Sequence, residues 1–157
     1  MKKVVKVMLP LLFAATSLAQ FSSLIVWHRI VGVITAPGTS NTVAGFNSGG
    51  PWTASGGNAT VNFIQGTVGF VVEGLVLVGG NASGTRGGVA SVRGTLVCDA
   101  GAADQVIIDT PVVPLSAQGN ASFSGHFESA PPPTCINPLF LIRTGAVWIA
   151  TGAVREP

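Results

Sequence analysis

The segment from Ala121 to Glu128 reads ASFSGHFE and has the clearest strand pattern in the chain. Apolar or small residues alternate there with polar ones, in a period of two residues. Successive side chains of a strand point to opposite faces, so this period predicts a half-buried antiparallel strand. Val89 to Cys98 shows the same alternation and places Cys98 on the inward face.

Strand patterns of this kind fill most of the chain after residue 20, whereas no window of a dozen residues has helical periodicity free of Gly or Pro. The two longest runs are apolar on both faces; they are Leu24–Ile34 and Thr67–Val78. Each is predicted to be either one long central strand or two strands with a bend, at Gly32 or Gly74 respectively. With turn signals between them, about nine strands predict a single-domain antiparallel β-sandwich with Greek-key connections, immunoglobulin-like or jelly-roll-like. Six shorter runs are also predicted to be strands: Val43–Phe46, Ala59–Gln65, Gln105–Asp109, Val112–Ser116, Pro138–Arg143 and Ala146–Val154.

The composition agrees with a single exported domain. The chain has 157 residues, which suits one domain. Charged residues make up 9% and hydrophobic residues 47%, and this is the opposite of the disordered signature, which combines low hydrophobicity with high net charge.

The first nineteen residues are predicted to be a signal peptide, which leaves residues 20–157 as a secreted domain. Three lysines precede a short apolar segment, and Ser17-Leu18-Ala19 supplies the small residues of a cleavage site. An uncut anchor is the alternative, but the apolar segment is short for a membrane span. We therefore expect an extracellular or periplasmic protein with no membrane span after cleavage.

Removal of this segment changes the net charge, because all three lysines lie within it. The remainder carries five arginines and six carboxylates, a net charge of −1. So few scattered cations exclude nucleic acid and anionic lipid as partners.

Cys98 and Cys135 are predicted to form one disulfide, because an even number of cysteines in an exported chain is usually paired. A loop of this length stabilises a fold by roughly 4 kcal/mol in the chain-entropy model. Two buried free thiols are the alternative. The absence of a CxxC pattern argues against a redox enzyme.

Three short sequences of the form G-N-A-[ST] occur at Asn58, Asn81 and Asn120. Gly and Asn tolerate positive φ, so each is predicted to be a tight turn before a strand. The same triplets are formal N-glycosylation sequons, whose use depends on the host.

Residues with catalytic or metal-binding chemistry are few, and we assign no catalytic, cofactor-binding or metal site. His126 and Glu128 share a strand face and supply at most two ligands, so a solvated face is the simpler interpretation. His28 lies in an apolar strand, as a packed or rim residue. Glu73 is predicted to pair with Arg93 or Arg143 if buried, or else to be exposed at a rim.

Trp52 is the candidate contact for a ligand or partner, because it lies in the Gly-, Pro- and Ser-rich loop GGPWTASGG. The alternative is that Trp52 folds back and caps the sandwich. Trp27 and Trp148 lie in strands and are predicted to be core residues.

Together these features favour an exported, non-enzymatic β-sandwich that acts by contact at a cell surface, in a matrix or in an assembly. Sheet edges without lysines favour self-association by strand addition, and a surface protein or glycan is the other candidate partner. A glycan- or small-ligand-binding module using the Trp52 loops is the alternative function. A small secreted hydrolase or metalloprotein around His126 and Glu128 is a third.

Overall fold

The computed structural model describes residues 23–36 and 38–156, and this part of the chain is all-β. The predicted signal peptide, residues 1–19, lies outside the described residues. Thirteen strands are present in the described part instead of about nine, because several connections contain strands of only two or three residues. The strands are β1 (Leu24–Gly32), β2 (Thr42–Val43), β3 (Phe46–Ser48), β4 (Trp52–Thr53), β5 (Gly56–Asn62), β6 (Thr67–Glu73), β7 (Val76–Leu77), β8 (Ser91–Cys98), β9 (Val106–Asp109), β10 (Val113–Pro114), β11 (Ala121–His126), β12 (Leu139–Thr144) and β13 (Val147–Glu156).

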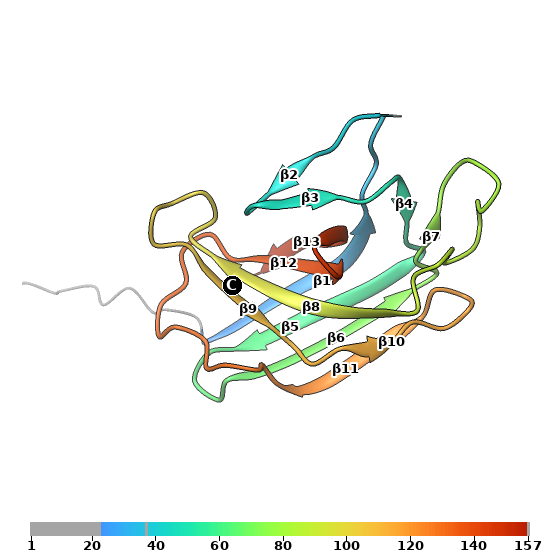
Figure 1. The fold of residues 1–157 in the computed structure, drawn as a ribbon. Helices are drawn as coiled ribbons and strands as arrows, with labels where there is room; N and C mark the ends of the chain where they lie inside the picture. The colour runs from blue at the N-terminus through green and yellow to red at the C-terminus, as the bar shows by residue number, and fades with distance from the viewer. Residues whose placement is uncertain (1–22, 37, 157) are drawn as a thin grey trace, which may run out of the picture.

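One curled sheet contains all of these strands except β4 and β7, which pair with each other. Its main path follows the order β10-β8-β12-β13-β1-β5-β6-β11, with antiparallel pairing throughout. β9 adds to the side of β8, and the β2–β3 hairpin joins β13 through a short parallel pair. Because the sheet curls, β8 lies over β5 and β6 (Figure 1), and Phe140 of β12 packs against Trp27 of β1 and Phe70 of β6. The predicted antiparallel sandwich is therefore confirmed, with both layers drawn from one sheet.

Aromatic side chains fill the space between the two layers. Trp27 lies 5.5 Å from Phe140, and Phe70 lies 5.9 Å from Phe140 and 6.1 Å from Phe123, measured between ring centroids. Gly94 of β8 lies against this cluster, where an added Cβ atom would approach Cζ of Phe140 to 2.6 Å. The absence of a side chain at this position lets the two layers close over the rings.

The predicted disulfide is confirmed. Cys98, at the end of β8, is fully buried and is bonded to Cys135, with a Cα–Cα distance of 4.9 Å. The alternation in Val89–Cys98 therefore assigned the inward face of this strand correctly. The bond ties β8 to the proline-rich segment that leads into β12.

Gly74 provides the predicted bend, since it has a φ of +58° and separates β6 from β7. Two other local predictions were wrong. Val43–Phe46 is not a strand but the turn of the β2–β3 hairpin, where Ala44 and Gly45 both have positive φ. Asn58 lies inside β5 rather than in a turn, because the strand begins two residues earlier, at Gly56.

The outward sides of the two layers differ in what covers them. On the outward side of β8, β12 and the start of β13, five residues are between 0% and 7% exposed. We call this side the covered face, and its residues are Thr95, Val97, Leu141, Arg143 and Trp148. The β2–β3 hairpin lies over it (Figure 1), and Trp148 donates from Nε1 to the carbonyl oxygen of Asn41, 3.0 Å away.

The outward side of β1, β5, β6 and β11 has no such cover, and we call it the bare face. Its residues alternate with core residues along each strand and are half-buried or exposed. They are Val26, Asn58, Thr60, Asn62, Thr67, Gly69, Val71, Glu73, Ser122, Ser124 and His126. Arg29 joins them, because the alternation along β1 shifts by one residue at His28 and leaves Arg29 exposed beside the buried Ile30.

Candidate functional site

Trp52, the predicted ligand contact, belongs to the hydrophobic core. It is 3% exposed, its backbone N–H donates to Val33, and β4 pairs it with Leu77. The ring therefore offers no face on which a sugar or a partner could stack. The flexible appearance of GGPWTASGG was misleading, because its backbone is fixed by neighbours that are distant in sequence.

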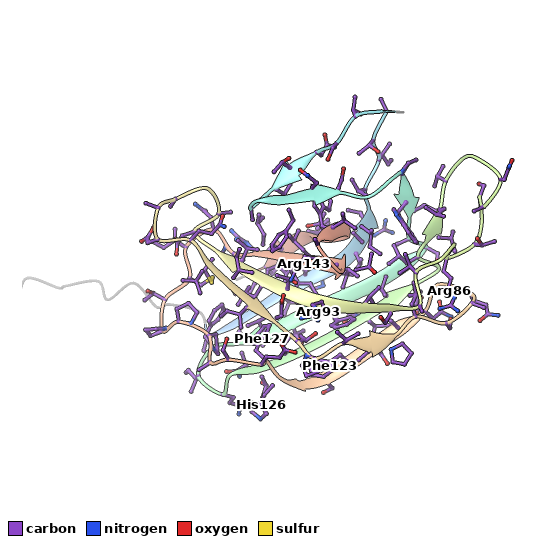
Figure 2. All side chains as sticks on the ribbon, viewed as in Figure 1. Arg86, Arg93, Phe123, His126, Phe127 and Arg143 are labelled. Carbon is purple, nitrogen blue, oxygen red and sulfur yellow. A yellow bond between two sulfur atoms is a disulfide. The ribbon has the colours of Figure 1, made fainter. Side chains whose placement is uncertain are left out.

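His126 and Glu128 do not form a joint site. The Nδ1 atom of His126 lies 3.2 Å from the carbonyl oxygen of Gly66, in the turn between β5 and β6. Glu128 instead lies 3.7 Å from Arg93 on β8. In Figure 2, His126 lies at the outer edge of the molecule, away from Arg93 and Arg143. Residues 23–36 and 38–156 contain no group of three or more His, Cys, Asp or Glu side chains that could hold a metal ion.

His28 is exposed and pairs with Glu156, with 3.0 Å between Nε2 and Oε2. This pair joins β1 to the end of β13 on the surface. The predicted rim position of His28 is therefore the one observed.

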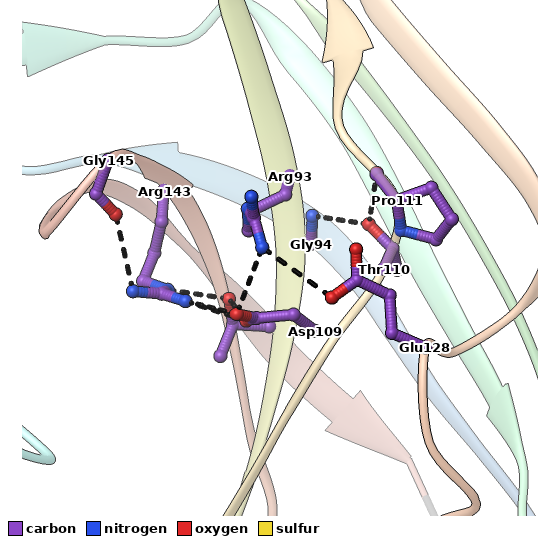
Figure 3. A network of polar contacts seen from close by, with 9 residues as sticks. Arg93, Gly94, Asp109, Thr110, Pro111, Glu128, Arg143 and Gly145 are labelled. Atoms are coloured by element: carbon purple, nitrogen blue, oxygen red, sulfur yellow. Dashed lines mark hydrogen bonds and ion pairs between the residues drawn. The ribbon is translucent and has the colours of Figure 1, made fainter.

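The densest polar cluster surrounds Arg143 on the covered face, and the sequence did not predict it (Figure 3). Nη2 of Arg143 donates to both carboxylate oxygens of Asp109, at 2.7 and 2.6 Å, and Nε donates to Thr95 at 2.7 Å. The guanidinium carbon also lies 3.9 Å from the centre of the Phe46 ring. Arg93 makes a second ion pair with Asp109, at 3.2 Å.

This cluster fixes the charge state of Asp109. Burial alone would raise the pKa of the Asp109 carboxyl, but hydrogen bonds from Thr95 and Arg143 and the positive charges of Arg143 and Arg93 outweigh burial and lower that pKa. With Arg143 only 6% exposed and enclosed by its partners, the cluster stabilises the covered face and leaves little room for a ligand.

Position along the strands explains why these groups meet. Arg143 pairs with Arg93 across β12 and β8, and Asp109 pairs with Thr95 across β9 and β8. A register shift lies between Ile142 and Arg143, and such bulges change the direction of a side chain. The sequence could show that Arg93 and Thr95 point outward, but not that β9 and β12 flank β8.

Glu73 is not the partner of either arginine. Its side chain is exposed at the end of β6, on the bare face. The alternative prediction of an exposed rim position is therefore the correct one, because Asp109 takes both arginines that could have paired with Glu73.

Glu73 lines the largest hollow described on the bare face, an open groove of about 660 Å³. The rest of its lining comes from β6, from the start of β11, from Pro114 of β10 and from neighbouring loop residues. Those residues are Ser55, Val71, Val72, Gly74, Pro114, Asn120, Ala121 and Ser122. The lining offers hydroxyl and amide groups, one carboxylate and small apolar patches.

The end strands of the curled sheet, β10 and β11, lie side by side (Figure 1). Ser116 donates from its backbone N–H to Asn120 at one end, and Glu128 donates to Asp109 at the other, at 2.9 and 2.8 Å. Pro114, which lacks an N–H, is half of β10. Each end strand therefore partly shields the edge of the other.

Comparison of the chain with protein-family models, with curated proteins and with solved structures finds no match. In the described part of the chain, no helix is long and apolar enough to span a membrane.

Proposed function

We propose that this chain is an exported, non-enzymatic β-sandwich that acts by contact, as a self-associating component of a cell surface or extracellular matrix. The observation that carries the proposal is the bare face. Small, mostly uncharged side chains occupy it, and it lies on strands that are hydrogen-bonded to each other over most of their length. Such a face is rigid before contact, which lowers the entropic cost of association.

The disulfide supports the location, since Cys98 and Cys135 pair stably only where the environment is oxidising. Export through residues 1–19 remains part of the proposal. The contrast with the covered face supports a contact role for the bare face. The β2–β3 hairpin buries the outward side of β8 and β12, whereas no segment of the described chain lies over the bare face.

Light scattering coupled to size-exclusion chromatography, on secreted protein over a hundredfold range of concentration, tests the proposal. We expect the apparent mass to rise with concentration. A monomer at every concentration would contradict self-association. Strand addition at the edge of β11 is a second route to the same result and remains a prediction.

A small-ligand or glycan function is the second candidate, and the 660 Å³ groove beside Glu73 favours it. Titration calorimetry with soluble polysaccharides tests this function, with Ser122→Arg as the variant that fills the groove. Heat of binding that Ser122→Arg abolishes would support it. Absence of heat with the unaltered protein would exclude it.

A further inference from the structure

Two opposite charges on the bare face have no partner within the described residues. Arg29 on β1 and Glu73 on β6 are both exposed, and neither side chain makes an ion pair or a hydrogen bond in residues 23–36 and 38–156. The two differ from Arg93, Arg143, Asp109 and Glu128, which neutralise each other. Arg29 also lines a hollow of about 240 Å³ between β1 and β5.

The strand arrangement places these charges on opposite sides of β5. Trp27, opposite Ala59, is the last residue of β1 that pairs with β5, and Arg29, two residues further along, lines the same hollow as Gly56 and Gly57. Glu73 pairs with Gly56 across β6 and β5. Arg29 and Glu73 therefore lie one strand to either side of β5, near the start of that strand at Gly56.

Consider two copies whose bare faces meet, related by a twofold axis that runs parallel to β5 and lies midway between the two faces. This rotation places β1 of one copy over β6 of the other. Each Arg29 would then face Glu73 of the second copy, so one isologous contact would form two ion pairs. Packed sheets lie about 10 Å apart, a gap that Arg and Glu side chains can bridge from opposite sides. Between Arg29 and Glu73, β5 begins with Gly56 and Gly57, which have no side chains to hold the two copies apart. Val26 and Val71 add apolar area to the contact.

We infer that the bare face is a homodimer interface, in which Arg29 of each copy pairs with Glu73 of the other around a twofold axis along β5. The inference rests on the proposed function and deepens it, since it names the partner as a second copy and names the contact surface. Opposite charges that fit each other across a face select orientation, and like charges in the same place are strongly unfavourable.

Charge reversal tests the pairing, because neither side chain has a contact whose loss would impair folding. Glu73→Arg or Arg29→Glu alone places like charges together, and we expect the dimer dissociation constant to rise at least about tenfold. The double variant restores opposite charges, and we expect its dissociation constant to return to near that of the unaltered protein. Asp104→Arg, an equal change of charge at an exposed loop position, is the matched control and should leave the constant unchanged.

Sedimentation velocity over a range of concentrations separates the outcomes. Weaker association in both single variants with recovery in the double variant supports the inference. Association that is indifferent to the single changes, or not restored in the double variant, would overturn the inference and leave self-association through another surface. A monomer at all concentrations in the unaltered protein would overturn both the inference and the proposed function.

Discussion

The outward sides of the two layers have the same backbone geometry but opposite fates. On the covered face, Arg143 and Thr95 are buried and hydrogen-bonded to each other, and Phe46 of the β2–β3 hairpin packs against Arg143. On the bare face, Thr60 and Ser124 occupy equivalent outward positions and meet solvent. The chain therefore covers the outward side of one layer with its own hairpin, whereas the bare face of the other layer remains exposed to solvent.

The largest effect is expected from breaking the ion network of the covered face. Arg143→Leu leaves Asp109 with only the Thr95 hydroxyl and the partly exposed Arg93 as partners, and removal of one member of a buried pair typically costs about 3–5 kcal/mol. Urea denaturation followed by circular dichroism measures the free energy of unfolding. Arg29→Leu, on the bare face, is the control and should change that free energy by less than about 0.5 kcal/mol. Equal losses in the two variants would contradict the distinction between the faces.

The next largest effect is expected from Gly→Ala substitutions, which should destabilise the protein at a core-facing position but not on the bare face. In Gly94→Ala, the new Cβ meets Phe140 at 2.6 Å and Phe70 at 3.0 Å, and overpacking of this kind costs about 1–3 kcal/mol. In Gly69→Ala, on the bare face, the nearest atom is Oγ1 of Thr60, at 3.3 Å, so we expect a change within about 0.5 kcal/mol. Thermal unfolding of both variants provides the comparison, and a larger loss in Gly69→Ala would refute it.

A smaller effect is expected in acid. The pKa of Asp109 is lowered in the folded protein from its ordinary 3.8. Its contribution to stability is therefore fully present above about pH 4 and is lost as the pH falls through the folded-state pKa. Denaturation at a series of pH values should show a steeper loss below pH 4 in the unaltered protein than in Asp109→Asn, which has no carboxyl group to protonate. Parallel pH profiles would show that Asp109 is not stabilised by its partners.

The smallest effect is expected from exchanging polar groups on the bare face. Ser124→Ala removes a hydroxyl group that has no partner among the described residues, so the free energy of unfolding should change by less than about 0.5 kcal/mol. Thr95→Ala on the covered face is its counterpart. It removes the hydroxyl group that accepts from Arg143 and donates to Asp109, and it should cost about 1–3 kcal/mol. Denaturant midpoints measure both variants, and equal shifts of the two midpoints would contradict the distinction between the two faces.

Alternation in sequence predicted much of the fold because it reports which side of a strand is buried. It located β8 and β11 and placed Cys98 inward. It did not identify the turn at Ala44 and Gly45, since both strands of that hairpin are too short to show a period.

The candidate site was harder to predict, because it depends on which strands are neighbours. Asp109 and Arg143 are 34 residues apart and meet only because β9 and β12 both flank β8. Trp52 has an exposed-looking local sequence, yet its burial is decided by Val33 and Leu77, which are distant in sequence. Local patterns predict the faces of strands, whereas pairing order decides which side chains meet.

Sedimentation equilibrium of two arginine variants tests most directly whether the open face is the contact surface. Thr60→Arg adds a charge at the centre of the bare face, and Thr42→Arg adds the same charge on the exposed side of the hairpin that covers the other face. We predict that association is lost in Thr60→Arg and retained in Thr42→Arg. Equal association of the two variants would contradict the account.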